Sequence, residues 1–157
     1  MRKRTRRKVY PLLNPIAHAI EGACITTQED LDKLRQRELK SLESFRSGQA
    51  TLTDWQNIKA MLNVAESMSR DGVGTEVLAV CVQAQEHLVQ SAMRYQRIGK
   101  IGASGPALVC WRDLYEYYDL QRQSISRGEY ERYLLQAVNR ERNKAPGVQV
   151  IFSECMK

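Results

Sequence analysis

The chain has 157 residues, of which 43% are hydrophobic and 27% charged, a composition typical of one folded domain and unlike that of a disordered protein. Its longest apolar run has six residues, Val77 to Val82, whereas a membrane helix needs roughly 20, so a membrane span is excluded. No apolar segment follows the charged N-terminus, and we therefore expect a cytoplasmic protein.

The net charge of +6 comes from one short segment. Six of the 24 Lys and Arg residues lie among the first eight residues: Arg2, Lys3, Arg4, Arg6, Arg7 and Lys8. The remaining 18 balance the 18 Asp and Glu residues, so the rest of the chain is formally neutral. We predict a flexible basic arm over residues 1–8, a single helical domain over 9–147 and a C-terminal tail over 148–157.

Capping residues and apolar spacing predict the first two helices. Asn14, Pro15 and Gly22 indicate a short helix over 15–21. Thr26 with Glu29 forms a capping box ahead of a long helix from about Gln28 to Ser47. Its expected apolar stripe consists of Leu31, Leu34, Leu39, Leu42 and Phe45.

The next two helices follow short connections, which predict antiparallel packing. Thr53 with Gln56 is the expected capping box of one helix, and Thr75 is the expected cap of the other, which extends to about Arg97. The first two turns of the latter are nearly all apolar, so we expect burial on more than one face. The predicted stripes are Trp55, Ile58, Met61, Leu62, Ala65 and Met68 in one, and Val77, Val80, Cys81, Ala84, Leu88, Ser91, Ala92 and Tyr95 in the other.

Two more helices complete the predicted domain. Pro106 opens one that extends to about Ser124, and Ser126 with Glu129 caps a last helix that stops before Pro146. Their expected buried residues are Leu108, Trp111, Leu114, Tyr115 and Tyr118, then Tyr130, Leu134, Ala137 and Val138. Residues 148–152 are compatible with a short strand. The predicted fold is an all-α, antiparallel bundle of about five helices with long amphipathic helices, and we expect a homodimer.

Residues that could support catalysis or hold a metal are few. His18 and His87 are the only histidines, neither belongs to a nucleophile or base motif, and His87 is expected to be solvated. The four cysteines lack the spacing of metal ligands, so we expect reduced, structural thiols. We therefore predict a protein that is not an enzyme and needs neither a metal nor a cofactor.

Three glycines, Gly99, Gly102 and Gly105, precede the helix that Pro106 opens. Backbone amides at such a place can bind an anion, but the spacing matches no phosphate-binding fingerprint. A loose connection between two helices is the simpler interpretation.

The basic arm is the strongest functional signal, because clustered Lys and Arg neutralise phosphates. A second cluster, Arg140, Arg142 and Lys144, ends the last helix. We predict that both clusters contact nucleic acid or a partner. The alternatives are a solubilising terminus for the arm and simple complementation of the helix dipole for the second cluster.

Several segments carry a resemblance to known proteins. They are residues 3–10 and 14–20, then Leu-Asp-Lys-Leu-Arg at 31–35, Tyr-Tyr-Asp-Leu-Gln-Arg-Gln-Ser-Ile-Ser-Arg at 117–127 and Glu-Tyr-Glu at 129–131. Together they resemble small helical proteins of proteobacterial prophages and other mobile elements, some of which are labelled Fis-like regulators. The resemblance implies a non-enzymatic protein that either regulates genes of the element or disables a host defence, as anti-CRISPR proteins do.

The leading hypothesis is an anti-CRISPR-like inhibitor that binds and blocks a bacterial nucleic-acid-processing defence complex, such as a CRISPR effector. The first alternative is a DNA-binding transcriptional regulator that uses the basic arm and the last helix on DNA or RNA. A structural or assembly protein of the mobile element is a further alternative.

Overall fold

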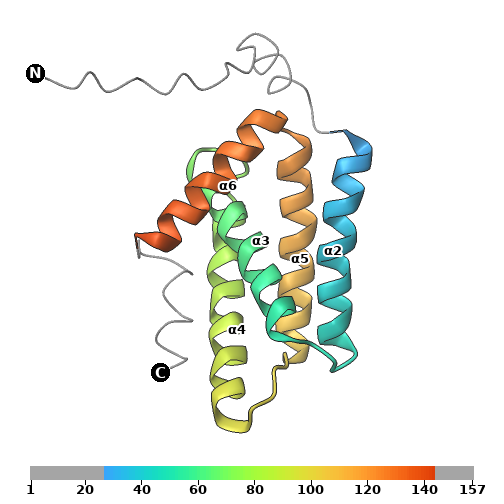
Figure 1. Ribbon diagram of the computed structural model, residues 1–157. Coiled ribbons are helices and arrows are strands. Elements are labelled where there is room, and N and C mark those ends of the chain that lie inside the picture. Colours follow the sequence, from blue (N-terminus) through green and yellow to red (C-terminus); the bar gives the residue numbers. More distant parts are fainter. Residues whose placement is uncertain (1–26, 144–157) are drawn as a thin grey trace, which may run out of the picture.

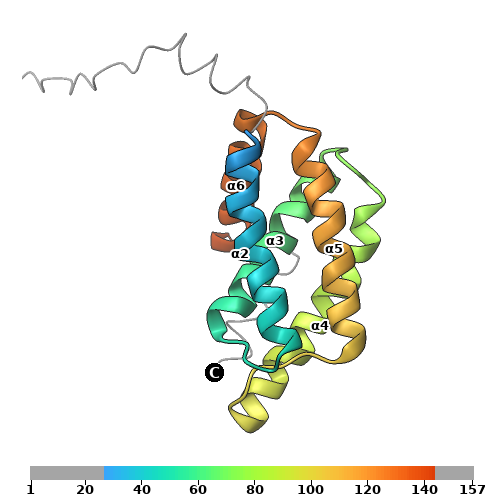
Figure 2. The ribbon, with the colours of Figure 1, turned by 90° about the vertical axis from the view of Figure 1, so that its right-hand side faces the viewer.

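The computed structural model describes residues 27–143, which form five α-helices (Figure 1). They are α2 (Gln28–Arg46), α3 (Leu52–Arg70), α4 (Val77–Ile98), α5 (Gly105–Gln123) and α6 (Arg127–Arg142). Helices α2 to α5 run alternately up and down, and α6 crosses one end of the bundle (Figures 1 and 2). The predicted all-α bundle is therefore confirmed, whereas the helix expected over 15–21 and the strand expected over 148–152 lie outside the described residues.

Helix α3 is the centre of the bundle and contacts all four other helices. Its predicted stripe is buried, but burial also extends around the whole helix over residues 61–69. The buried hydroxyls of Ser67 and Ser69 donate to the carbonyls of Asn63 and Ala65, each at 2.9 Å. These bonds within the helix use the proton of each hydroxyl, so neither serine needs an acceptor on another helix.

Both tryptophans fill the core and are held against α4. The indole nitrogen of Trp55 donates to the Leu88 carbonyl and that of Trp111 to the Ala84 carbonyl, each at 3.2 Å. Each indole thus buries a large apolar surface while its single polar atom remains hydrogen-bonded.

A glutamine on α5 fixes the turn between α3 and α4. The Gln121 amide nitrogen donates to the Val73 carbonyl at 2.7 Å and to the Ser69 hydroxyl at 2.9 Å. Gly74 follows with a φ of 68°, and a Cβ there would touch the Gln121 side chain at 3.4 Å. The turn therefore combines a left-handed backbone with close contact to α5.

Three predicted helix starts need correction. Thr27, and not Thr26, accepts the Asp30 N–H at the start of α2. Thr51 with Asp54 forms the capping box of α3 in place of Thr53 with Gln56, because the Asp54 carboxylate is a stronger acceptor for the cap N–H than an amide.

Helix α4 begins after Glu76 without a side-chain cap. Its first N–H groups instead donate to backbone carbonyls of the preceding turn, Val77 to Gly74 and Leu78 to Thr75. The capping box of Ser126 and Glu129 at α6 is confirmed.

Some predicted core positions are exposed. On α2, Leu39 is exposed while Glu38 is buried, so the centre of the buried face is polar. On α4 the expected burial of a second face is wrong, since Val82 faces solvent. On α6, Leu134 and Val138 are exposed and Tyr133 takes a buried place, because α6 packs against α3 along one narrow side. No helix within residues 27–143 is both long and apolar enough to cross a membrane.

Candidate functional site

Some of the predicted basic residues lie within residues 27–143 and the others lie outside them. The arm residues Arg2 to Lys8 and Lys144 lie outside the described residues, whereas Arg140 and Arg142 occupy the last turn of α6. The Arg140 guanidinium pairs at 3.2 Å with the buried Glu66 carboxylate of α3, and Arg142 is exposed. Arg140 therefore helps to hold α6 on the bundle, so only Arg142 of this pair is presented freely on the surface.

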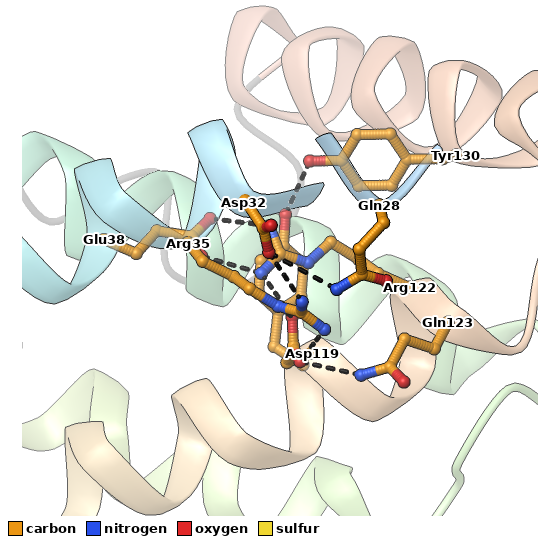
Figure 3. Close-up of polar contacts among 9 residues, drawn as sticks. Gln28, Asp32, Arg35, Glu38, Asp119, Arg122, Gln123 and Tyr130 are labelled. Carbon is orange, nitrogen blue, oxygen red and sulfur yellow. Dashed lines mark hydrogen bonds and ion pairs between the residues drawn. The ribbon is translucent and has the colours of Figure 1, made fainter. Parts of the chain in front are cut away.

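A buried ion-pair network joins α2 to α5 (Figure 3). The Arg122 guanidinium donates to both oxygens of Glu38, at 3.1 and 2.9 Å, and to Asp119 at 2.9 Å. The Arg35 guanidinium donates to both oxygens of Asp119, at 2.9 and 2.8 Å. The side chains of Arg122 and Glu38 are only 1% and 2% exposed, so this pair is fully enclosed between the helices.

The environment moves the pKa values of the two carboxylates of this network in opposite directions. Burial raises the pKa of Glu38, against the opposing charge of Arg122. Burial also acts to raise the pKa of Asp119, but the hydrogen bond from Arg35 and the charge of Arg122 outweigh it and hold that pKa below its usual value. Every oxygen of both carboxylates accepts a hydrogen bond, so no carboxylate oxygen of this network is free for proton transfer. The role of the network is therefore to hold α2 against α5.

A third group of charges lies where α4 ends and α5 begins. Between Glu86 and Asp113 the sequence contains no acidic residue, yet it contains Arg94, Arg97 and Lys100. These three side chains are exposed and form no ion pair with any residue of 27–143. We call them the basic end of the bundle. Because the described body holds as many acidic as basic residues, these unpaired cations give one end a local positive charge.

The histidine and the cysteines of the described body lie in different surroundings. His87 is half-buried, which corrects the expectation of a solvated side chain, and its Nδ1 has no hydrogen-bond partner among the described residues. Cys81 and Cys110 are free and buried as expected, and burial raises the pKa of the Cys81 thiol to about 12. Within residues 27–143, no three His, Cys, Asp or Glu side chains are grouped as a metal site would require.

Comparison of the chain with protein-family models, curated proteins and solved structures gives no match. The site is therefore defined by its own chemistry. Sequence analysis did not identify the basic end, although the run of residues without an acid between positions 86 and 113 was a signal that could have found it. No comparable signal in the sequence indicated the partners of Arg140 and Glu38, because the residues of these two pairs lie 74 and 84 positions apart in the chain.

Proposed function

We propose that the protein is a non-enzymatic binding protein that blocks a bacterial nucleic-acid-processing defence complex, as an anti-CRISPR inhibitor does. The observation that carries the proposal is the charge arrangement: the described body, residues 27–143, is neutral overall and bears at one end Arg94, Arg97 and Lys100, which form no ion pair within that body. Such a body has little general affinity for duplex phosphate, while its basic end and the arm can contact nucleic acid held by another protein.

Exposed apolar side chains on α6 support contact with a protein. Leu134 and Leu135 are adjacent in α6, Val138 lies one turn later, and the three are 38%, 65% and 51% exposed. A helix that enters the major groove meets polar base edges and phosphates, so three exposed aliphatic side chains are poorly suited to that role. They suit the apolar centre of a protein interface, including that of the expected homodimer. These side chains favour the inhibitor over the DNA-binding regulator. The regulator would also need Arg140 to contact DNA, whereas Arg140 is paired with Glu66.

The test is co-purification from a bacterial host that carries an active nucleic-acid-guided defence complex. The tagged full-length chain is recovered with and without nuclease, at low and high salt. We expect a stoichiometric protein complex that survives nuclease, together with loss of cleavage by that complex in the host. Recovery of DNA alone, lost with nuclease or salt, would replace the inhibitor with the regulator.

Matched variants assign the contacts. Arg94→Gln with Arg97→Gln should weaken capture of the defence complex. The binding that remains should depend less on salt, since fewer phosphates are neutralised. Arg37→Gln with Lys40→Gln removes the same charge from exposed positions of α2 that form no ion pair with any residue of 27–143, and it should change nothing. Leu135→Gln should weaken capture of the protein component even after nuclease treatment. A chain lacking residues 2–8 that keeps every partner would exclude the arm from the mechanism.

A further inference from the structure

A small pocket lies beside the basic end, between the last turns of α4 and the start of α5. Its volume is about 210 Å³, which is enough for a phosphate group. The lining combines side chains of α4 with the loop that leads into α5, and it contains no acidic residue. The lining residues are His87, Gln90, Ser91, Arg94, Arg97, Gly102, Ala103, Ser104 and Ala107.

Ser91 gives the lining of this pocket a buried hydroxyl. Ser91 is 3% exposed, and its Oγ has no hydrogen-bond partner among the described residues. The buried serines of α3 differ, because Ser67 and Ser69 each donate to the carbonyl four residues earlier. Leaving a buried hydroxyl unpaired is unfavourable, so a group that accepts its proton is favoured here.

Two arginines supply the charge that an anion needs. Arg94 and Arg97 line the pocket, and the Arg94 guanidinium lies so close to the loop that a Cβ on Gly102 would come within 3.2 Å of its Nε. The start of α5, where Ser104 accepts the Ala107 N–H, faces the same space with the positive end of its dipole. Complementing the dipole at the end of α4 would account for Arg97, but it accounts neither for the unpaired Ser91 hydroxyl nor for the closeness of Arg94 to the loop.

We propose that this pocket binds a phosphate group, with the Ser91 hydroxyl donating to it and the Arg94 and Arg97 guanidinium groups binding its oxygens. Phosphate is bound well by arginine and hydroxyl donors in a pocket that has no carboxylate to compete for them. The phosphate belongs either to a nucleic-acid backbone or to a free small molecule. The backbone source rests on the proposed function, whereas the pocket itself does not.

The experiment titrates the full-length chain with inorganic phosphate at constant ionic strength, with chloride as the reference, and follows binding by calorimetry and by the amide resonances of residues 87–107. A parallel arm uses a short single-stranded oligonucleotide, with and without competing inorganic phosphate. Saturable binding of inorganic phosphate with shifts confined to the pocket is expected. Displacement of the oligonucleotide by phosphate identifies a backbone source, and phosphate binding without oligonucleotide binding identifies a free one and counts against the proposed function.

Three variants test the geometry of the site. Ser91→Ala and Arg94→Gln should each weaken phosphate binding about tenfold, since each removes a hydrogen bond to a charged group. Ser91→Ala breaks no hydrogen bond among residues 27–143, so its fold should be intact by circular dichroism. Gly102→Ala keeps every charge but displaces Arg94, and it should weaken binding less than Arg94→Gln does.

Arg37→Gln is the matched control, because it removes one exposed charge from α2, away from the pocket. Phosphate affinity that is the same in Ser91→Ala and Gly102→Ala as in the wild type would overturn the proposal, since only diffuse attraction to positive charge would then remain. No saturable binding of either probe to the wild-type chain would overturn it as well.

Discussion

Replacing Arg122 by Met tests whether the buried pair between α2 and α5 governs stability. Glu38 is 2% exposed, and Arg122 supplies both of its hydrogen bonds. The variant therefore leaves a buried carboxylate without a partner, which costs about 3–5 kcal/mol. Glu38→Leu should cost less, about 1–3 kcal/mol, because Arg122 keeps Asp119 at 2.9 Å and the Tyr118 ring at 4.3 Å.

The double variant separates the interaction free energy of the Glu38–Arg122 pair from the effects of the two single substitutions. With Glu38→Leu and Arg122→Met together, no unpaired charge is buried, because Asp119 keeps its two hydrogen bonds from Arg35. Its stability should lie within about 1 kcal/mol of the wild type, since buried ion pairs can often be replaced by apolar side chains without loss. The coupling free energy between the two substitutions should therefore be at least about 3 kcal/mol.

Urea unfolding followed by tryptophan fluorescence measures these free energies, because Trp55 and Trp111 are both fully buried. In Arg122→Met, the arginine no longer opposes the effect of burial, so the folded-state pKa of Glu38 rises further above the unfolded value of about 4.3. The stability of this variant is then greatest below the unfolded pKa and is lost as pH rises through the folded pKa. Its deficit against the wild type should accordingly be smaller at pH 4.5 than at pH 7.5. Additive costs, or a deficit independent of pH, would refute this reasoning.

Three further predictions concern other parts of the fold. Thr51→Ala should lower the free energy of unfolding by about 1 kcal/mol, whereas Thr53→Ala should leave it nearly unchanged; equal effects in urea unfolding would contradict the capping geometry. Gln121→Leu should cost about 1–3 kcal/mol by leaving the Val73 carbonyl without its donor, and faster hydrogen exchange should be confined to the turn after α3. Because burial raises the pKa of Cys81 to about 12 and also that of Cys110, both thiols should resist iodoacetamide at pH 8 until denaturant is added, which peptide mapping by mass spectrometry will show.

Local signals predicted the helices well, and their errors have local causes. The Ser126 capping box was placed correctly because a serine and a glutamate at the right spacing have no rival nearby. The start of α3 was misplaced by two residues, since Thr51 and Thr53 are each followed three residues later by a polar acceptor, and the stronger acceptor, the Asp54 carboxylate, belongs to Thr51. Periodicity likewise placed Leu39 in the core, although Glu38 takes that place through its bond to Arg122.

The sequence by itself determined that the chain forms antiparallel helices, because capping, apolar spacing and helix breaks act over a few neighbouring residues. It also showed that positive charge is concentrated near the N-terminus. Only the tertiary structure decided which charges are paired: Arg140 is bound to Glu66 and Arg122 to Glu38, whereas Arg94 has no ion pair within residues 27–143. The same holds for the pocket around Ser91, since a hydroxyl becomes a buried donor without a partner only when the loop after α4 and the start of α5 fold back beside it.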